Sequence, residues 1–226
     1  EKSLKIALEI GDRGGETGPY ANLGNAFYSL GNYRKAIKYH EKCLKIVIDI
    51  GDRGVEGTAY GNLGNVYKSL GNYQKAIEYH EKRLKIAIEI GDREAEGTAY
   101  GDLGNAYNSL GDHRKAIDYY EKHLNIAIEI GHRQGEGAAN GNLGNAYNSL
   151  GDHRKAIEYL EKHLNTAIET GDRYGVGASY HNIGMAYFSV EQFKKAADNF
   201  ASAVNAFNSL RSLLKSKDNW KITFRE

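Results

Sequence analysis

Residues 60–70 read Tyr-Gly-Asn-Leu-Gly-Asn-Val-Tyr-Lys-Ser-Leu, and close copies of this stretch recur along the chain at a fixed spacing. Its core returns with small changes at residues 23–27, 103–107 and 143–147, and as Ile-Gly-Met-Ala-Tyr at 183–187. Successive copies are 40 residues apart, with no insertions. Such a period indicates a solenoid, in which identical supersecondary units stack on their neighbours.

Glycine followed by Asn or Asp divides each unit into two helices. Gly51-Asp52 suits the end of one helix and the start of the next, because glycine enters the left-handed region at low cost and Asp is a good N-cap. Gly71-Asn72 repeats this signal, so we expect helices over roughly 53–70 and 73–90. Val190-Glu191 replaces the pair in the last unit, which predicts a different turn there.

The second helix of each unit is apolar over more than half of its circumference. A helix of this kind must be packed between neighbours, so one unit cannot be stable alone. The sequence therefore predicts an all-α, right-handed superhelical solenoid of antiparallel helix pairs, as a single array over residues 1–226. The expected parts are the second helix of a truncated repeat (1–13), five repeats (14–53, 54–93, 94–133, 134–173 and 174–216) and a capping helix (217–226).

The repeat resembles the tetratricopeptide repeat (TPR) family. Its pattern of Trp-x2-Leu-Gly-x2-Tyr followed by an alanine is matched at Tyr60, Leu63, Gly64, Tyr67 and Ala76. HEAT and armadillo repeats have a similar length, but they do not explain the Leu-Gly-x-x-Tyr spacing. The resemblance implies a scaffold for protein–protein interaction.

Two narrower resemblances concern parts of the chain. The 40-residue length, the Gly-Asn-Leu-Gly-Asn-Ala-Tyr string and the Gly-Asp-Arg junction resemble the repeats of Partner-of-Inscuteable (LGN) proteins over about residues 1–175. From Gly184 onward the sequence is more similar to large animal TPR proteins whose arrays precede a CHAT domain. These resemblances imply a fragment of a longer array and a signalling adaptor.

The resemblance implies that the first helix of each pair lines a concave groove. Asn, with Asp or Met in single repeats, recurs there, and a carboxamide can pair with both the N–H and the C=O of an extended peptide. Gly61, Gly101 and Gly141 are expected to give the peptide clearance. The alternative is that these amides are solvated or tie adjacent helices together. The candidate peptide-binding residues are Asn22, Asn25, Asn62, Asn65, Asp102, Asn105, Asn142, Asn145, Asn182 and Met185.

Two further features bear on the ligand. Chaperone-tail-binding TPR domains have a lysine at the position held here by Ala21 and the three glycines, so that ligand is not expected. The fifth repeat presents His181, Met185 and Phe188 instead of small or amide residues. They would form either a pocket for an anchor side chain or a surface covered by residues 217–226, whose Trp220 and Phe224 share a helical face; we favour the covered surface.

Composition excludes several classes of function. The 30 Lys and Arg balance 29 Asp and Glu, which argues against a general nucleic-acid or membrane-surface protein. No apolar run is long enough for a membrane span, and the single cysteine, Cys43, fits a reducing, cytoplasmic location. Histidines one period apart are too distant to share zinc. We expect no enzyme activity, catalytic residue, metal or cofactor.

The function expected is therefore a scaffold that binds an extended peptide or partner segment. A structural spacer that positions a downstream domain is the alternative. Because the truncated Glu1 end exposes an uncapped apolar face, the chain could also self-stack.

Overall fold

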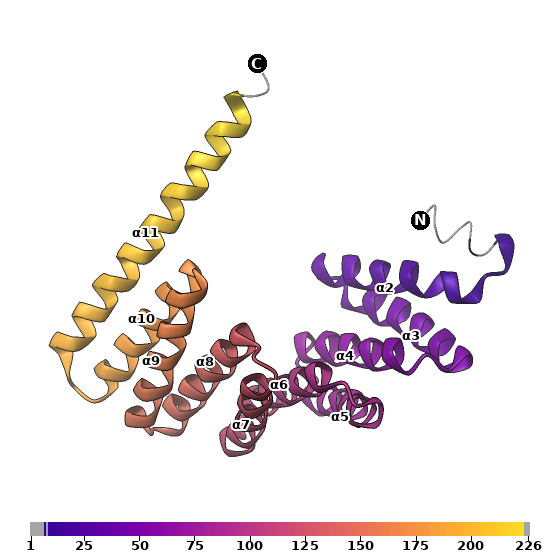
Figure 1. The fold of residues 1–226 in the computed structure, drawn as a ribbon, viewed down its shortest axis with the longest axis horizontal. Coiled ribbons are helices and arrows are strands. Elements are labelled where there is room, and N and C mark those ends of the chain that lie inside the picture. The colour runs from indigo at the N-terminus through magenta and orange to yellow at the C-terminus, as the bar shows by residue number, and fades with distance from the viewer. Residues whose placement is uncertain (1–6, 8, 224–226) are drawn as a thin grey trace. The chain divides into compact units, whose positions relative to one another are not determined.

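The computed structural model describes the backbone of residue 7 and residues 9–223, with side chains as far as residue 213. From residue 13 onward this part consists of helices joined by short turns, without a strand (Figure 1). The helices are α2 (Arg13–Ser29), α3 (Tyr33–Ile50), α4 (Arg53–Ser69), α5 (Tyr73–Ile90), α6 (Arg93–Leu110), α7 (His113–Glu129), α8 (Arg133–Leu150), α9 (His153–Thr170), α10 (Arg173–Ser189) and α11 (Phe193–Thr223).

The chain forms two compact units, residues 1–126 and 127–226, which we call unit 1 and unit 2. In unit 1, α2 to α6 pack in chain order, each helix against the next. In unit 2, α8 packs on α9, α9 on α10 and α10 on α11. The even-numbered helices α2 to α10 are the first helices of the five expected pairs, which we call A helices, and α3 to α11 are the second, or B, helices.

The helix ends follow the predicted punctuation. Gly51 adopts a φ of 75°, and the Asp52 side chain accepts a hydrogen bond from the Val55 N–H at 3.0 Å. His132 replaces the capping Asp at the start of α8 and makes no such bond. Glu191 occupies the position of the turn glycine with a φ of 59°, alone among the described non-glycine residues. The turn glycines Gly31 and Gly71 have φ values of 71° and 76°, so the last turn keeps the same backbone conformation and the predicted different turn is wrong. Only the residue differs, and the left-handed conformation is costly to a side chain.

The aromatic residues that carry the TPR pattern pack between the two helices of a pair. In repeat two, the Tyr67 ring on α4 stacks on Tyr79 of α5, with centroids 5.4 Å apart. The ammonium group of Lys75 lies 4.8 Å from the Tyr67 centroid, a cation–π distance. Because the same contacts recur in repeat three, at Tyr107, Tyr119 and Lys115, a repeated sequence gives a repeated helix pair.

The C-terminal helix does not follow the predicted division. Residues 217–223 continue α11 without a break, and in Figure 1 this helix is visibly longer than α10, on which it packs. The side chains of Trp220 and Phe224 lie outside the described part, so their capping role stays a prediction.

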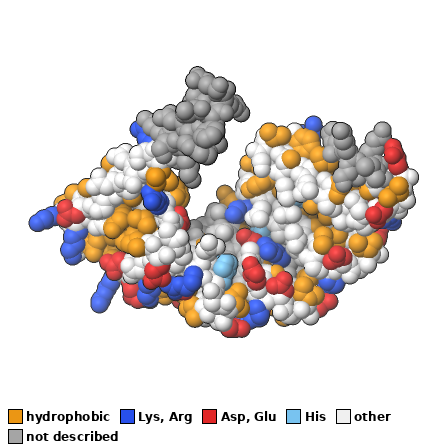
Figure 2. Space-filling view, turned by 45° about the horizontal axis from the view of Figure 1, so that its top comes forward, with side chains coloured by type: hydrophobic (Ala, Val, Ile, Leu, Met, Phe, Trp, Pro, Cys, Tyr) orange, Lys and Arg blue, Asp and Glu red, His pale blue; other side chains and the backbone are white. Residues whose placement is uncertain are grey.

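The surface is mixed in charge. On the face that Figure 2 presents, basic and acidic side chains intermingle and do not form a field of one sign. In the described part of the chain, no helix combines the length and apolar character needed to cross a membrane.

Candidate partner-binding surfaces and a neighbouring cavity

Four of the predicted amides lie on two adjacent A helices of unit 1. Asn22 and Asn25 on α2 are exposed, and Asn62 and Asn65 on α4 are partly exposed. The helices α2 and α4 contact each other. None of the four side chains hydrogen-bonds to another side chain or backbone group in the described part of the chain. Their donors and acceptors are therefore available to a ligand.

Asp102 on α6 is already occupied within the protein. Its Oδ2 lies 2.8 Å from Nη1 of Arg83 on the preceding B helix, α5. The side chains of Asp102 and Arg83 are 16% and 19% exposed, so the ion pair is largely screened from water. The other repeats have Asn at this position and no arginine at the position of Arg83. Asp102 therefore pairs repeats two and three and is a poor candidate for ligand binding.

Asn105 is also engaged. The Tyr120 hydroxyl on α7 donates to Asn105 Oδ1 at 2.9 Å. Burial raises the pKa of Tyr120, so it remains a donor at neutral pH. The Asn105 oxygen has thus used one of its two lone pairs within the protein.

In unit 2, two of the predicted peptide-binding residues are bonded to each other, and two others are at least partly exposed. Asn142 on α8 is partly exposed. Asn182 on α10 donates through Nδ2 to Asn145 Oδ1 on α8 at 3.0 Å, so the alternative that amides tie adjacent helices together is confirmed for this pair. Met185 is 44% exposed, beside Phe188 at 54%.

The clearance predicted for Gly61, Gly101 and Gly141 is wrong. A Cβ added at each would lie 3.0 Å from a side chain of the following B helix, namely Arg83, His123 and His163 respectively. The missing side chain therefore makes room for helix-on-helix packing and not for a peptide. The sequence pattern placed these glycines beside the amides of the A helices, but it did not show that the partner helix covers this face.

In unit 1, two buried histidines each pack against a glycine of the facing A helix. His40 under Gly24 is 1% exposed, and His80 under Gly64 is fully buried. Burial lowers the pKa of His40, and it lowers that of His80 to about 4 despite Asp102 at 3.7 Å. Both rings are therefore neutral core side chains at pH 7. No three His, Cys, Asp or Glu side chains of the described residues gather into a group able to hold a metal ion.

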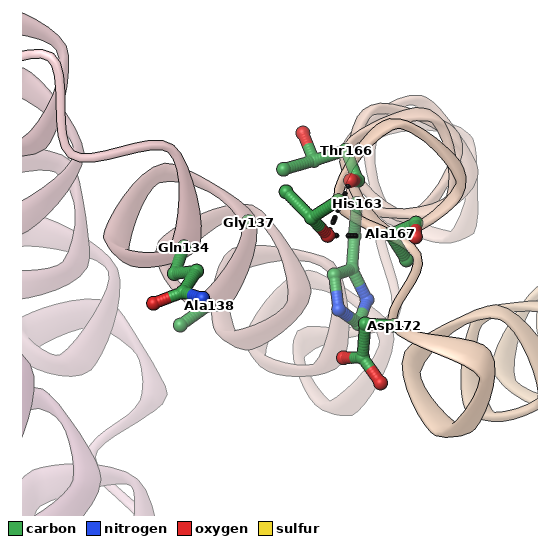
Figure 3. Close-up of a pocket in the computed structure, with 8 residues that line it drawn as sticks. Gln134, Gly137, Ala138, His163, Thr166, Ala167 and Asp172 are labelled. Carbon is green, nitrogen blue, oxygen red and sulfur yellow. Dashed lines mark hydrogen bonds between the residues drawn. The ribbon is translucent and has the colours of Figure 1, made fainter.

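Unit 2 contains a cavity that the sequence did not predict. It has a volume of about 340 Å³ and lies between α8, α9 and the turn before α10. Figure 3 shows the His163 ring extending from α9 into this space, with Asp172 below it and Gln134 and Ala138 across from it. The lining residues are Gln134, Gly137, Ala138, His163, Thr166, Ala167, Thr170 and Asp172.

The family follows from this architecture together with the sequence. The sequence profile of the tetratricopeptide repeat matches residues 18–89, 55–129 and 136–209, which is most of the chain. This chain belongs to the tetratricopeptide repeat family. TPR arrays typically mediate protein–protein interaction and are generally not enzymes.

Solved TPR structures share the fold. BtubC (BKLC) from P. vanneervenii is 23% identical, with a TM-score of 0.81 over 93% of this chain and 89% of that one. The STAND ATPase with a tetratricopeptide repeat sensor from Pyrococcus horikoshii is 25% identical, with a TM-score of 0.79 over 96% of this chain and 34% of that one. MamA is 24% identical, with a TM-score of 0.61 over 87% and 94%.

No curated protein sequence matches significantly. The structural similarities confirm the predicted fold class, an all-α TPR solenoid.

Proposed function

We propose that this TPR array binds a partner protein by holding an extended segment against the A helices α2 and α4 of unit 1. The observation that carries the proposal is the set of four uncommitted amides on these two helices, Asn22, Asn25, Asn62 and Asn65. Buried peptide groups need hydrogen-bond partners, and each amide supplies a donor and an acceptor. The concave faces of repeat arrays provide extended binding surfaces of this kind.

The proposal uses only part of the predicted set of peptide-binding residues. Asp102, Asn105, Asn145 and Asn182 are engaged within the protein, and a ligand would have to displace these bonds. Exchanging a satisfied internal hydrogen bond for one to a ligand gains little free energy. Asn142 and Met185 in unit 2 remain secondary candidates.

A phage-displayed library of random peptides tests the proposal. Peptides enriched on the wild-type protein should lose at least about tenfold in affinity when Asn22, Asn25, Asn62 and Asn65 are replaced by Ala, because each lost hydrogen bond contributes on the order of 1 kcal/mol. The matched control replaces Asn125 and Asn165, exposed amides on the B helices α7 and α9. Unchanged affinity in a folded quadruple variant would rule out this surface. Failure to enrich any peptide would favour the structural spacer.

The narrower assignments belong to the same proposal. The 40-residue period supports a Partner-of-Inscuteable-like subtype, and the sequence after Gly184 supports an array that precedes a CHAT domain. A cytoplasmic signalling adaptor is the role consistent with both. Self-stacking through the N-terminal end is tested by measuring the molar mass across a concentration series.

A further inference from the structure

The cavity in unit 2 has a smaller counterpart in unit 1, and the two can be compared residue by residue. Positions 80 residues apart are equivalent, so Gly137 corresponds to Gly57 and Asp172 to Asp92. The counterpart has a volume of about 50 Å³, against about 340 Å³ in unit 2. The cavity of repeat four is therefore much larger than the equivalent cavity of repeat two.

Three of the substitutions between the two linings replace a long side chain by a shorter one. Ile86 and Ile90, which line the smaller cavity, become the shorter Thr166 and Thr170, and the long Arg83 becomes His163. Two of these changes also replace apolar groups by hydroxyl groups. Two isoleucine side chains beside the cavity of repeat two are therefore replaced by hydroxyl-bearing side chains in repeat four.

Both threonine hydroxyls donate their hydrogen atoms to backbone carbonyl groups of α9. Thr166 donates to the Lys162 carbonyl at 3.1 Å, and Thr170 donates to the Thr166 carbonyl at 2.8 Å. A hydroxyl has one hydrogen and two lone pairs, so both oxygens keep only acceptor capacity.

The tautomer of His163 follows from its partner. The Ser179 hydroxyl lies 2.8 Å from the Gly175 carbonyl, which can only accept, and 2.9 Å from His163 Nδ1. Ser179 therefore donates its one hydrogen to Gly175 and accepts from Nδ1–H. Burial lowers the pKa of His163, which keeps the ring neutral and leaves Nε2 as an acceptor.

The remaining charge on the cavity is negative. Asp172 accepts the Gly175 N–H through Oδ1 at 2.9 Å, and a carboxylate has further lone pairs to offer. The nearby Arg133 is held by Glu136 and Glu169. In repeat two, Arg83 lines the equivalent cavity and pairs with Asp102, the residue equivalent to Asn182.

We propose that this cavity binds a primary alkylammonium group, as carried by a lysine side chain or a free aliphatic diamine. An ammonium has three donors and no acceptor, which complements Thr166, Thr170, His163 and Asp172. Ala138 and Ala167 provide the apolar contact for the alkyl chain. Hydrogen bonds between an ammonium and a carboxylate are about twice as strong as neutral ones.

Isothermal titration calorimetry with three small molecules tests this inference. Nα-acetyl-lysine methylamide represents the lysine side chain, cadaverine the free diamine, and Nα-acetyl-norleucine methylamide has no ammonium group. We expect saturable binding of one or both ammonium compounds and none of the norleucine compound. The tighter of the two identifies the source.

Two cavity variants introduce side chains that occur at comparable positions in other repeats. Thr166→Ile with Thr170→Ile restores the side chains found at 86 and 90, and Asp172→Asn retains an N-cap residue like Asn72 while removing the charge. Each should weaken binding at least about tenfold, the effect of losing one charge-assisted hydrogen bond or more. Thr98→Ile on α6 of unit 1, at an exposed threonine, is the matched control and should bind as wild type.

Specific outcomes would overturn the inference. They are no saturable binding of either ammonium compound, equal binding of the norleucine compound, or wild-type affinity in both cavity variants. The unit 1 variant in which Asn22, Asn25, Asn62 and Asn65 are replaced should bind the ammonium compounds normally. Failure here and failure of the partner-binding proposal are therefore distinguishable.

Discussion

Repeats two and four form equivalent helix pairs with a glycine at the same position of the A helix, but different side chains pack against that glycine. A Cβ on Gly64 in unit 1 would meet the ring of His80, whereas a Cβ on Gly144 in unit 2 would meet the Leu160 side chain. Both side chains are fully buried. The backbone geometry of the pair thus accepts either an imidazole or an isobutyl group, and the two units differ in how their cores respond to protons.

The same comparison shows how the array tolerates variation. The position of Gly61 is Ala21 in repeat one, where the facing side chain is the small Cys43, and it is Gly where the facing residue is the larger Arg83, His123 or His163. In repeat five it is His181, whose ring centroid lies 5.7 Å from that of Phe200, and the residue equivalent to Arg83 is the small Ala203. A large side chain at the B-helix position thus goes with a small residue at the A-helix position, and the reverse, as close packing requires.

The largest expected effect is acid destabilisation of unit 1 through His80. Its folded pKa of about 4 lies below the ordinary value of 6.5, so the unfolded chain takes up the proton first. This contribution is complete above pH 6.5, falls as pH decreases toward 4 and levels off below it. Because the Asp102 carboxylate favours protonation of His80 less than burial disfavours it, the net loss of stability is about 3 kcal/mol. His80→Leu should abolish it.

Hydrogen exchange at a series of pH values, read separately from unit 1 and unit 2 peptides, measures this loss. His40 acts in the same direction in unit 1, and the partly exposed His163 gives unit 2 a smaller loss. The other charges near His80 are Arg83 and Lys68, which both disfavour the imidazolium. An unchanged pH dependence in His80→Leu would show that protonation of other groups drives the acid transition.

The converse change, Leu160→His, moves the unit 1 chemistry into unit 2. It should destabilise unit 2 by about 2 kcal/mol at pH 7, because the imidazole nitrogens are desolvated at a site built for an apolar side chain. The loss should grow as pH falls below 6.5. Leu160→Met, which conserves volume, is the control and should cost less. Denaturant titration followed by hydrogen exchange in unit 2 reports the difference; a pH-independent loss would contradict the argument.

A third contrast is the ion pair of Arg83 and Asp102, which the equivalent position in unit 2 lacks. Arg83→His leaves the largely buried Asp102 carboxylate without its cation and should cost unit 1 about 1–2 kcal/mol. Adding Asp102→Asn recreates the Asn and His combination of residues 182 and 163 and should restore most of the loss. Chemical denaturation of the two single variants and the double variant gives the coupling energy. Additive effects would mean that the pair contributes nothing.

The regular parts of this comparison could be predicted from sequence, and the departures could not. Gly51-Asp52 and Gly71-Asn72 mark the helix ends by local backbone chemistry, so those boundaries agree with the structure. The groove role of Gly61 was wrong because a helical wheel does not show which face the partner helix covers. The cavity was missed although Thr166 and Thr170 interrupt a column of isoleucines, a signal visible only when repeats are compared position by position.

The smallest expected effect concerns the helix caps at which the units differ. His132 begins α8 in unit 2 without a capping bond, whereas Asp92 begins α6 in unit 1 by accepting from the Ala95 N–H at 2.9 Å. His132→Asp should therefore stabilise unit 2 by about 1 kcal/mol, because an Asp N-cap satisfies one free N–H of the first turn. Asp92→Ala should destabilise unit 1 by a similar amount. Thermal unfolding of both variants measures the pair, and opposite signs of nearly equal size are expected. If His132→Asp leaves the stability unchanged, the Gly131-His132 turn must hold α8 in a geometry that an Asp side chain does not improve.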